Sequence, residues 1–512
     1  MFNKNKLIIS LMFFSLMSVG WGQNCIDGEE VELWGECYNI DETTYFSLPD
    51  NQLTGEIPPE IGDLINLEVL TLSFNELIGQ IPSEIGNLTN LRSLNLHENQ
   101  LTGEIPSSIG NLSNLEIFSL YNNQLTGEIP SSIGNLSNLD VLFLNNNQLI
   151  GEIPSEIYEI TNLNGLNLNW NQITGEIPPE IGNLTNLSYL GLKSNQLTGE
   201  IPSEIGNLMN LYKLILPFNE FTGEIPPEIG NLTNLTTLEL GWNQLTGEIP
   251  SEIGNLTNLY NLSLSYNEFT GEIPLDIGSL TNLISLTLNN NQLSGLIPSE
   301  IGNLTDLDIL SLMVNNFIGE IPSEIGNLIN LVTLSLDDNQ LSGFIPLEIG
   351  NLNNLEGLGL SNNQFSGPLP NEIGNLTNLI SIDLSHNYIE SIPYEIEDLV
   401  NLLILDLSSN NIDYINENIC NLPLLLYLNL QNNYLCEEYY YDCITVWEPQ
   451  ECIECPITGD INDDNFINIL DIVTLVSCIF SDGGCDECSD INGDNYINIL
   501  DVVTLVNMVL NN

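Results

Sequence analysis

Two stretches near the end of the chain carry oxygen-bearing side chains at the spacing of a calcium loop. The first begins at Asp460 and the second begins 30 residues later, at Asp490. Positions 1, 3, 5, 9 and 12 of each are Asp or Asn, and the backbone carbonyl at position 7 completes such a set. The predicted ligands of two Ca²⁺ ions are Asp460, Asn462, Asp464, Phe466, Asn468, Asp471, Asp490, Asn492, Asp494, Tyr496, Asn498 and Asp501.

An amphipathic segment follows each loop and would have to position it. These segments are residues 472–480 and 502–510, and both are rich in Ile, Val and Leu at helical spacing. The pattern predicts one helix after each loop and a small all-α, calcium-binding domain at residues 457–512.

Aspartate at position 12, a helix only after each loop, and duplication within about 55 residues resemble a type I dockerin. The resemblance implies two bound Ca²⁺ ions and a cohesin-type partner on an extracellular scaffold. Cellulosomal dockerins often have Ser-Thr at positions 10 and 11 and use them to recognise cohesin. Here these positions are Ile469-Leu470 and Ile499-Leu500. The identity of the docking partner therefore stays open, and a partner within the same chain is an alternative.

The ten cysteines lie only near the two ends of the chain. Cys25 and Cys37 stand near the start, and the other eight fall from Cys420 onward. An even number in a secreted chain favours disulfides that close terminal caps. The Cys-x-x-Cys pairs at Cys452 and Cys485 leave a zinc site as the alternative, and the sequence does not fix the disulfide pairing.

Between these ends the chain repeats itself. A marker asparagine recurs every 24 residues from Asn51 to Asn387, and two 23-residue units follow, marked by Asn410 and Asn433, which makes 17 units. The segment Leu-x-x-Leu-x-Leu-x-x-Asn predicts a short strand with inward leucines, and adjacent strands would form a parallel sheet on a concave face. The asparagine amide can satisfy backbone groups that the turn leaves unpaired. The Gly-x-Ile-Pro and Ile-Gly-Asn-Leu segments predict a convex side of irregular and 3-10 pieces.

These residues resemble the plant-type leucine-rich repeat of extracellular receptor ectodomains and pectinase-inhibiting proteins. The similarity covers about residues 40–435, and Trp34-Gly35-Glu36-Cys37 resembles the N-terminal cap of that family. It implies an α/β repeat solenoid that recognises proteins, peptides or glycans through its concave face. No binding residue follows from the motif itself. The predicted domains are a signal peptide (1–22), an N-terminal cap (23–45), the solenoid (46–435), a C-terminal cap and linker (436–456) and the dockerin-like domain (457–512).

The outward positions of the repeats suggest one ligand site. Aromatic residues stand directly before the marker asparagine in four of five successive coils, and two lysines fall on outward strand positions of adjacent coils. Aromatic rings and isolated cations are typical of binding hot spots. The predicted site residues are Trp170, Lys193, Lys213, Phe218, Trp242 and Tyr266. By contrast Phe221, Phe269, Phe317 and Phe365 replace an inward leucine and are predicted to be core.

Charge and targeting narrow the function further. The chain has 69 acidic and five basic residues, a net charge of −64, and two of the basic residues precede an apolar run at residues 7–19 that is typical of a secretory signal. Such a charge excludes nucleic acid as a ligand, because binding needs cations against phosphate. No segment is predicted to span a membrane.

The prediction is a secreted or cell-surface binding protein and not an enzyme. The solenoid would take an unknown protein, peptide or glycan. A structural adhesin or spacer without a specific ligand is the alternative. A polysaccharide-degrading component is less favoured, because the carboxylates lie in a regular ladder without a unique cleft.

Overall fold

The computed structural model describes residues 25–436, 439–448, 450, 467, 469–480, 491 and 497–511. The predicted signal peptide lies outside the described residues. The chain divides into two compact units, residues 1–339 and 340–512. In the described ranges no helix is long and apolar enough to cross a membrane.

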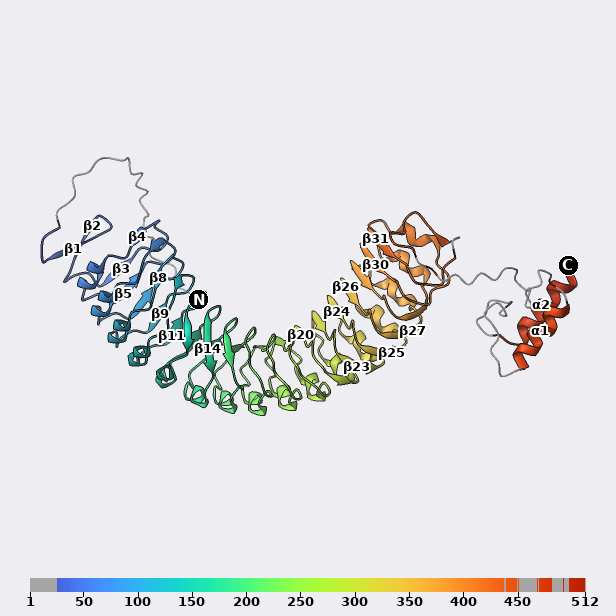
Figure 1. Cartoon of the computed structure of the whole chain (residues 1–512), viewed down its shortest axis with the longest axis horizontal. Helices are drawn as coiled ribbons and strands as arrows, with labels where there is room; N and C mark the ends of the chain where they lie inside the picture. The colour runs from blue at the N-terminus through green and yellow to red at the C-terminus, as the bar shows by residue number, and fades with distance from the viewer. Residues whose placement is uncertain are drawn as a thin grey trace, which may run out of the picture. The chain divides into compact units, whose positions relative to one another are not determined.

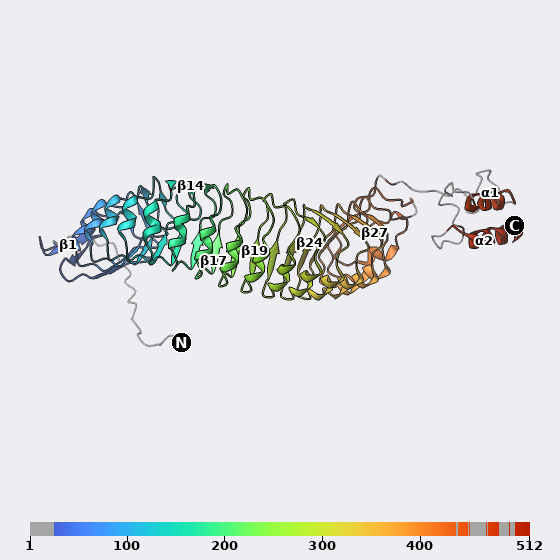
Figure 2. The same cartoon turned by 90° about the horizontal axis from the view of Figure 1, so that it is seen from below.

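The first unit is a stack of similar coils, each contributing one short strand to a parallel sheet (Figures 1 and 2). We call this the inner sheet, and its strands pair in register with the equivalent residues one repeat later, as Val141 pairs with Gly165. Its strands are β3 (Tyr45–Ser47), β5 (Val69–Thr71), β7 (Ser93–Asn95), β9 (Ile117–Ser119), β11 (Val141–Phe143), β13 (Gly165–Asn167), β15 (Tyr189–Gly191), β17 (Lys213–Ile215), β18 (Thr237–Glu239), β19 (Asn261–Ser263), β20 (Ser285–Thr287), β22 (Ile309–Ser311) and β24 (Thr333–Ser335).

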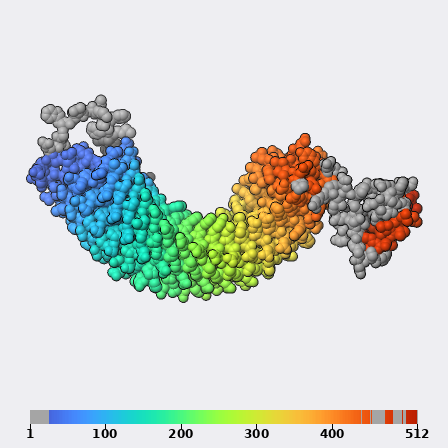
Figure 3. All heavy atoms as spheres, in the orientation of Figure 1, coloured from blue at the N-terminus to red at the C-terminus, as the bar shows by residue number. Residues whose placement is uncertain are grey.

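The core of this unit is built from the inward residues of every coil. The middle residue of each three-residue strand is buried, as Leu142 and Leu214 show with no exposed surface. Phe221, Phe269 and Phe317 are also fully buried, which confirms their predicted place in the core. In the space-filling view the coils lie directly against one another (Figure 3).

The marker asparagine links each coil to the coil before it. In Asn123, Oδ1 accepts the backbone N–H of Leu101 at 2.9 Å, and Nδ2 donates to the carbonyls of Leu96 and Leu120, both at 3.0 Å. Leu96 and Leu101 belong to the preceding coil. One buried amide thus satisfies backbone groups of two coils, as the sequence predicted, because an unpaired buried backbone group is costly.

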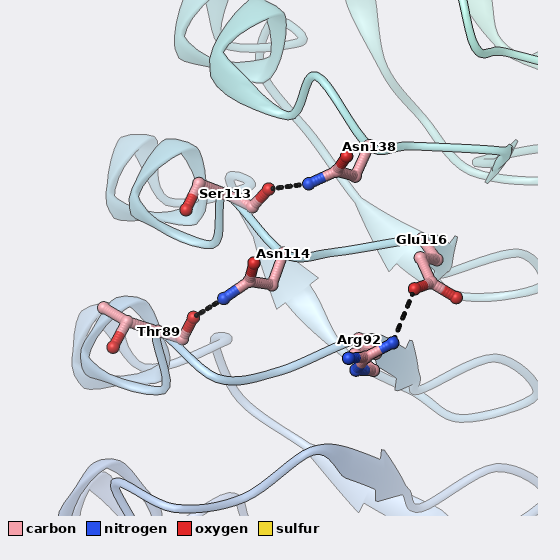
Figure 4. Close-up of polar contacts among 6 residues, drawn as sticks. All are labelled: Thr89, Arg92, Ser113, Asn114, Glu116 and Asn138. Atoms are coloured by element: carbon pink, nitrogen blue, oxygen red, sulfur yellow. Dashed lines mark hydrogen bonds and ion pairs between the residues drawn. The ribbon is translucent and has the colours of Figure 1, made fainter.

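A second asparagine, present in most repeats, also bonds the preceding coil, at the surface. Asn114 Nδ2 donates to the carbonyl of Thr89 at 2.9 Å, and Asn138 Nδ2 donates to Ser113 at 2.8 Å (Figure 4). These bonds also join consecutive coils, but they are exposed to solvent.

The opposite side of each coil is a five-residue 3-10 helix, as predicted. In the first unit each of these 3-10 helices follows a proline with extended backbone. A Cβ atom at Gly230 would lie 2.6 Å from the backbone oxygen of Glu252 in the next coil, so only glycine allows this close stacking. The helices are η1 (Pro59–Asp63), η2 (Ser83–Asn87), η3 (Ser107–Asn111), η4 (Ser131–Asn135), η5 (Ser155–Glu159), η6 (Pro179–Asn183), η7 (Ser203–Asn207), η8 (Pro227–Asn231), η9 (Ser251–Asn255), η10 (Leu275–Ser279), η11 (Ser299–Asn303) and η12 (Ser323–Asn327).

Short strands also follow the marker asparagine, which the sequence did not predict. Here Gly127 has a φ of +75°, and a Cβ on it would meet Glu104 Cγ at 2.6 Å, so the glutamate of one coil lies over the glycine of the next. The flank strands of the first unit are β4 (Thr54–Glu56), β6 (Glu76–Ile78), β8 (Thr102–Gly103), β10 (Gln124–Leu125), β12 (Ile150–Glu152), β14 (Gln172–Glu176), β16 (Gln196–Thr198), β21 (Ser294–Gly295) and β23 (Asn316–Gly319).

One coil of the first unit departs from the glycine rule. Tyr158 in η5 stands where the other coils of this unit have this glycine, and it is nonetheless buried. Its hydroxyl is buried and has no hydrogen-bond partner within the described residues. Burial raises the pKa of Tyr158 well above its ordinary value of 10.0, and the nearby charge of Glu180 raises it further.

Tyr158→Phe should therefore stabilise the first unit by about 1 kcal/mol at neutral pH, because it removes an unpaired buried hydroxyl. The effect should change above pH 10. There the unfolded chain loses the tyrosine proton while the folded chain keeps it, so the wild type loses stability as pH rises. The Tyr158→Phe variant should lose less stability over the same pH range. Urea unfolding at pH 7 and pH 11 measures both, with exposed Tyr260→Phe as the control. A variant that is less stable at both values would contradict this account.

The second unit begins with coils of the same kind. Phe365 is fully buried, as predicted. The inner strands are β26 (Gly357–Gly359), β28 (Ser381–Asp383), β30 (Ile404–Asp406) and β31 (Tyr427–Asn429); the flank strands are β25 (Gln340–Gly343), β27 (Gln364–Pro368) and β29 (Tyr388–Ser391); and the 3-10 helices are η13 (Leu347–Asn351), η14 (Asn371–Asn375), η15 (Tyr394–Asp398) and η16 (Glu417–Asn421). The unit also contains two α-helices, α1 (Ile469–Phe480) and α2 (Ile499–Asn511), close to the ranges that the sequence predicted. They pack around Leu475, Val502 and Leu505.

Disulfides close both ends of the coil array, as the cysteine positions predicted. At the start, Cys25 bonds Cys37, which lies in the second strand of an antiparallel hairpin of β1 (Glu30–Leu33) and β2 (Glu36–Asn39). At the other end, Cys420 bonds Cys443. No cysteine in the described part of the chain is free. The two Cys-x-x-Cys pairs lie outside the described residues.

Candidate functional site

The residue before each marker asparagine has a left-handed backbone. Its φ lies between 52° and 59° in all 17 coils. This conformation is costly for bulky side chains, whereas asparagine tolerates it. Several coils do use asparagine there, namely at Asn122, Asn146, Asn290, Asn362 and Asn432. Bulky residues also occur there singly, at Phe74, Val314 and His386, whereas four aromatic residues gather in five successive coils at Trp170, Phe218, Trp242 and Tyr266. This cluster at a costly conformation points to function.

Four of the predicted site residues occupy this left-handed position. Trp170, Phe218, Trp242 and Tyr266 have exposed fractions of 54%, 42%, 46% and 38%, so their side chains face solvent as predicted. The backbone conformation turns each of them away from the leucine core.

Three of these rings form a parallel stack. The centroid of Trp242 lies 5.3 Å from that of Phe218 and 3.7 Å from that of Tyr266, and the ring planes are within 14° of parallel in both pairs. One coil separates each ring from the next. The repeat spacing thus sets aromatic side chains at stacking distance.

Lys193 fills the coil that lacks an aromatic residue. Its Nζ lies 5.6 Å from the ring centroid of Trp170 and 5.5 Å from that of Phe218, a cation–π distance to both. The backbone N–H of Lys193 donates to Asn169 Oδ1 at 2.7 Å, which ties the backbone at Lys193 to the preceding coil. Trp170, Lys193, Phe218, Trp242 and Tyr266 therefore form one continuous row over five coils, which we call the aromatic column.

Lys213 does not join the column. It is the first residue of β17, at the other end of the strand, and its Nζ lies 6.0 Å from the ring of Tyr212. A second aromatic group, which the sequence did not predict as a cluster, lies on the inner sheet here. Tyr189 lies 6.4 Å from Phe143 and 6.5 Å from Tyr212 between ring centroids. The ring of Phe143 lies against Gly165 and that of Tyr189 against Gly191, where the absence of a side chain leaves room for them.

Tyr189 is tied into the inner sheet by its hydroxyl. Asn169 Nδ2 donates to Tyr189 Oη at 3.3 Å. Burial raises the pKa of Tyr189, although the bond from Asn169 opposes the rise. The hydroxyl stays protonated at neutral pH and is available to a ligand as a neutral group.

The two lysines carry charge that the described residues do not neutralise. Arg92 forms an ion pair with Glu116 at 3.1 Å (Figure 4), whereas in the described ranges no carboxylate lies within ion-pair distance of Lys193 or Lys213. In a chain with a net charge of −64 these are rare free cations.

Of the twelve predicted calcium ligands, the structure describes Asp471, Asn498 and Asp501. Asp471 and Asp501 are fully buried although they are carboxylates. Asp501 Oδ1 accepts the backbone N–H of Ile491 at 2.9 Å, and Oδ2 accepts that of Asn498 at 2.7 Å. Asn498 Oδ1 in turn accepts the N–H of Leu500 at 2.9 Å, so the pair caps the start of α2.

The remaining nine predicted ligands lie outside the described residues: Asp460, Asn462, Asp464, Phe466, Asn468, Asp490, Asn492, Asp494 and Tyr496. The two bonds of Asp501, the aspartate at position 12 of the second loop, tie Ile491 and Asn498 to the start of α2. This arrangement fits a calcium loop.

Comparisons with known proteins agree with the repeat. A family model described as a leucine-rich repeat region matches residues 119–224, 178–292 and 273–381, and a second, described as a leucine-rich repeat, matches residues 66–88, 90–112 and 378–399. A search of curated proteins finds no match.

Among solved structures, the plant peptide hormone receptor RGFR1 in complex with RGF2 is 39% identical over 75% of this chain and 65% of its own, with a TM-score of 0.68. A TDR receptor is 35% identical over 77% and 69%, with a TM-score of 0.74. A leucine-rich-repeat protein of Leptospira interrogans is 38% identical over 73% and 92%, with a TM-score of 0.59. The chain therefore spans less than two thirds of RGFR1.

Proposed function

The chain belongs to the leucine-rich-repeat family, and on that premise we propose that it is a secreted or cell-surface binding protein whose inner sheet recognises a protein, peptide or glycan. The aromatic column is the observation that carries this proposal. Four bulky rings at a left-handed backbone position exceed what a spacer needs, because asparagine fills the same position in other coils. The similarity to a receptor solved in complex with RGF2 adds support.

A structural adhesin or spacer is the second candidate. It would need length but no specific ligand, so substitutions in the column would be silent. The cost of the left-handed aromatics favours the binding function over this alternative.

We further propose that the C-terminal helices belong to a dockerin-like module with two Ca²⁺ ions. Asp471, Asn498 and Asp501 would hold the ions together with the nine loop residues named above, and the module would dock to a cohesin-type partner. The buried carboxylates of Asp471 and Asp501 support this assignment, because a calcium loop uses a carboxylate at position 12.

The proposed binding function predicts that the full chain binds members of an array of peptides and oligosaccharides. It also predicts that this binding depends on the aromatic column. Trp242→Asn should cost about 2 kcal/mol of binding free energy, the scale of a hot-spot residue. Stability should hardly change, because asparagine is the residue that other coils use at this position.

The matched control is Phe344→Asn, which removes an exposed aromatic residue of the second unit that lies outside the column. Equal binding by the wild type and the Trp242 variant would show that the ligand binds outside the aromatic column. If the folded chain binds nothing on the array, the spacer function would be favoured.

A further inference from the structure

The aromatic column hides its ring faces and presents its ring edges. Both faces of Trp242 are covered, by Phe218 on one side and Tyr266 on the other. Phe218 has Trp242 on one face, and the ammonium group of Lys193 lies over its ring. Only the outer ends of the row have a ring face that no column member covers.

This geometry selects among ligands. Sugar rings bind aromatic residues by lying flat on a ring face, and the interior of the column has no free face to offer. Ring edges carry the positive part of the aromatic quadrupole, so they attract oxygen atoms with partial or full negative charge. The exposed surface of the column is thus complementary to carbonyl and carboxylate oxygens.

Lys193 adds full charge to the surface of the column, whereas Lys213 lies apart from it at the other end of its strand. Lys193 is held between Trp170 and Phe218 and meets no carboxylate within ion-pair distance among the described residues. Ring contact leaves its N–H donors able to bind a carboxylate. Lys213 supplies a second cation on the neighbouring coil. The chain as a whole is strongly acidic, so within the column Lys193 is the group that can pair with a carboxylate of a ligand.

We propose that the aromatic column binds an extended polypeptide segment that carries acidic side chains, with a carboxylate at Lys193 and backbone carbonyl oxygens along the edges of Trp242 and Tyr266. This inference rests on the proposed binding function and names its ligand class. The row covers four repeat steps, about 20 Å at about 4.8 Å per step, which fits about six residues of extended peptide at about 3.3 Å per residue.

The test uses the full chain on one array with three kinds of probe. The first is a set of ten-residue peptides with two to four Asp or Glu residues among apolar ones. The second is the same set with Asn and Gln in place of the acids. The third is a set of neutral, uronic-acid and sulfated oligosaccharides. We expect binding to the acidic peptides, at least about tenfold weaker binding to their amide counterparts, and none to the neutral sugars.

Lys193→Gln should weaken binding of the acidic peptides about tenfold, and the loss should shrink at high salt, where charge is screened. Arg92→Gln is the matched control, because it removes an exposed cation that is paired with Glu116 and lies outside the column.

Failure of this inference and failure of the proposed function give different results. Column-dependent binding of oligosaccharides, or equal binding of acidic and amide peptides, would overturn the acidic-peptide assignment and leave the inner sheet as a binding surface. If neither Lys193→Gln nor Trp242→Asn weakens peptide binding, the aromatic column is not the binding site.

Discussion

Replacing Asn123 with alanine is expected to lower the free energy of unfolding of the first unit by about 3 kcal/mol. The side chain is buried and makes one bond to a backbone N–H and two short bonds to backbone carbonyls. Alanine would leave these groups without their partner in a site that water does not reach, and each such buried group costs about 1–3 kcal/mol. Two of the three belong to the preceding coil, so the loss also weakens the contact between coils.

The same repeat offers a control. Asn114→Ala removes a single exposed bond to Thr89 (Figure 4), where water can replace the amide, so we expect a loss below about 1 kcal/mol. Urea unfolding of both variants, followed by circular dichroism and by hydrogen exchange of the affected coils, measures the difference. Because solenoids can unfold in parts, the exchange data locate the loss. Equal effects of the two substitutions would contradict the role assigned to the marker asparagine.

The repeat made most of the fold predictable. A period of 24 residues places one residue type at one position in every coil, so a single coil predicts the inner strand, the 3-10 helix and the buried leucines of the others. The flank strands were missed because Thr-Gly-Glu has no alternation of apolar residues, and a strand there depends on pairing with the next coil. Tyr158 was missed for a related reason, because its burial depends on the neighbouring coil and not on its own repeat.

The candidate site was predictable in its members but not in its contacts. The sequence places Trp170, Phe218, Trp242 and Tyr266 at one repeat position, and the repeat spacing brings them together. It does not show that Lys193, one position earlier, leans into the gap, because that depends on side-chain direction. Nor does it separate Lys213, which lies at the far end of its strand beside Tyr212. Position in a strand decides which side chains meet.

The C-terminal helices offer the second large effect. On the proposal of two calcium loops, removing Ca²⁺ with EGTA should strip α1 and α2 of their protection against hydrogen exchange in the full chain. The first unit should be unaffected. The reason is electrostatic. Each loop gathers several carboxylate and amide oxygens, including buried Asp471 and Asp501, and without a cation the like charges repel one another in a poorly solvated site. Calorimetry should give two ions per chain.

Asp501→Asn separates metal binding from helix capping. An asparagine of the same size still has one oxygen to accept the N–H of Asn498 or of Ile491, so much of the cap survives. The charge that a calcium ion needs is lost, and we expect calcium affinity of that loop to fall by about 10–100-fold. Asp383→Asn is the control, since Asp383 binds Ser385 in a coil outside the helices. If the helices keep full protection in EGTA and calcium gives no heat, Asp501 serves only as a cap, and the apolar core around Leu475, Val502 and Leu505 holds the two helices together without a metal ion.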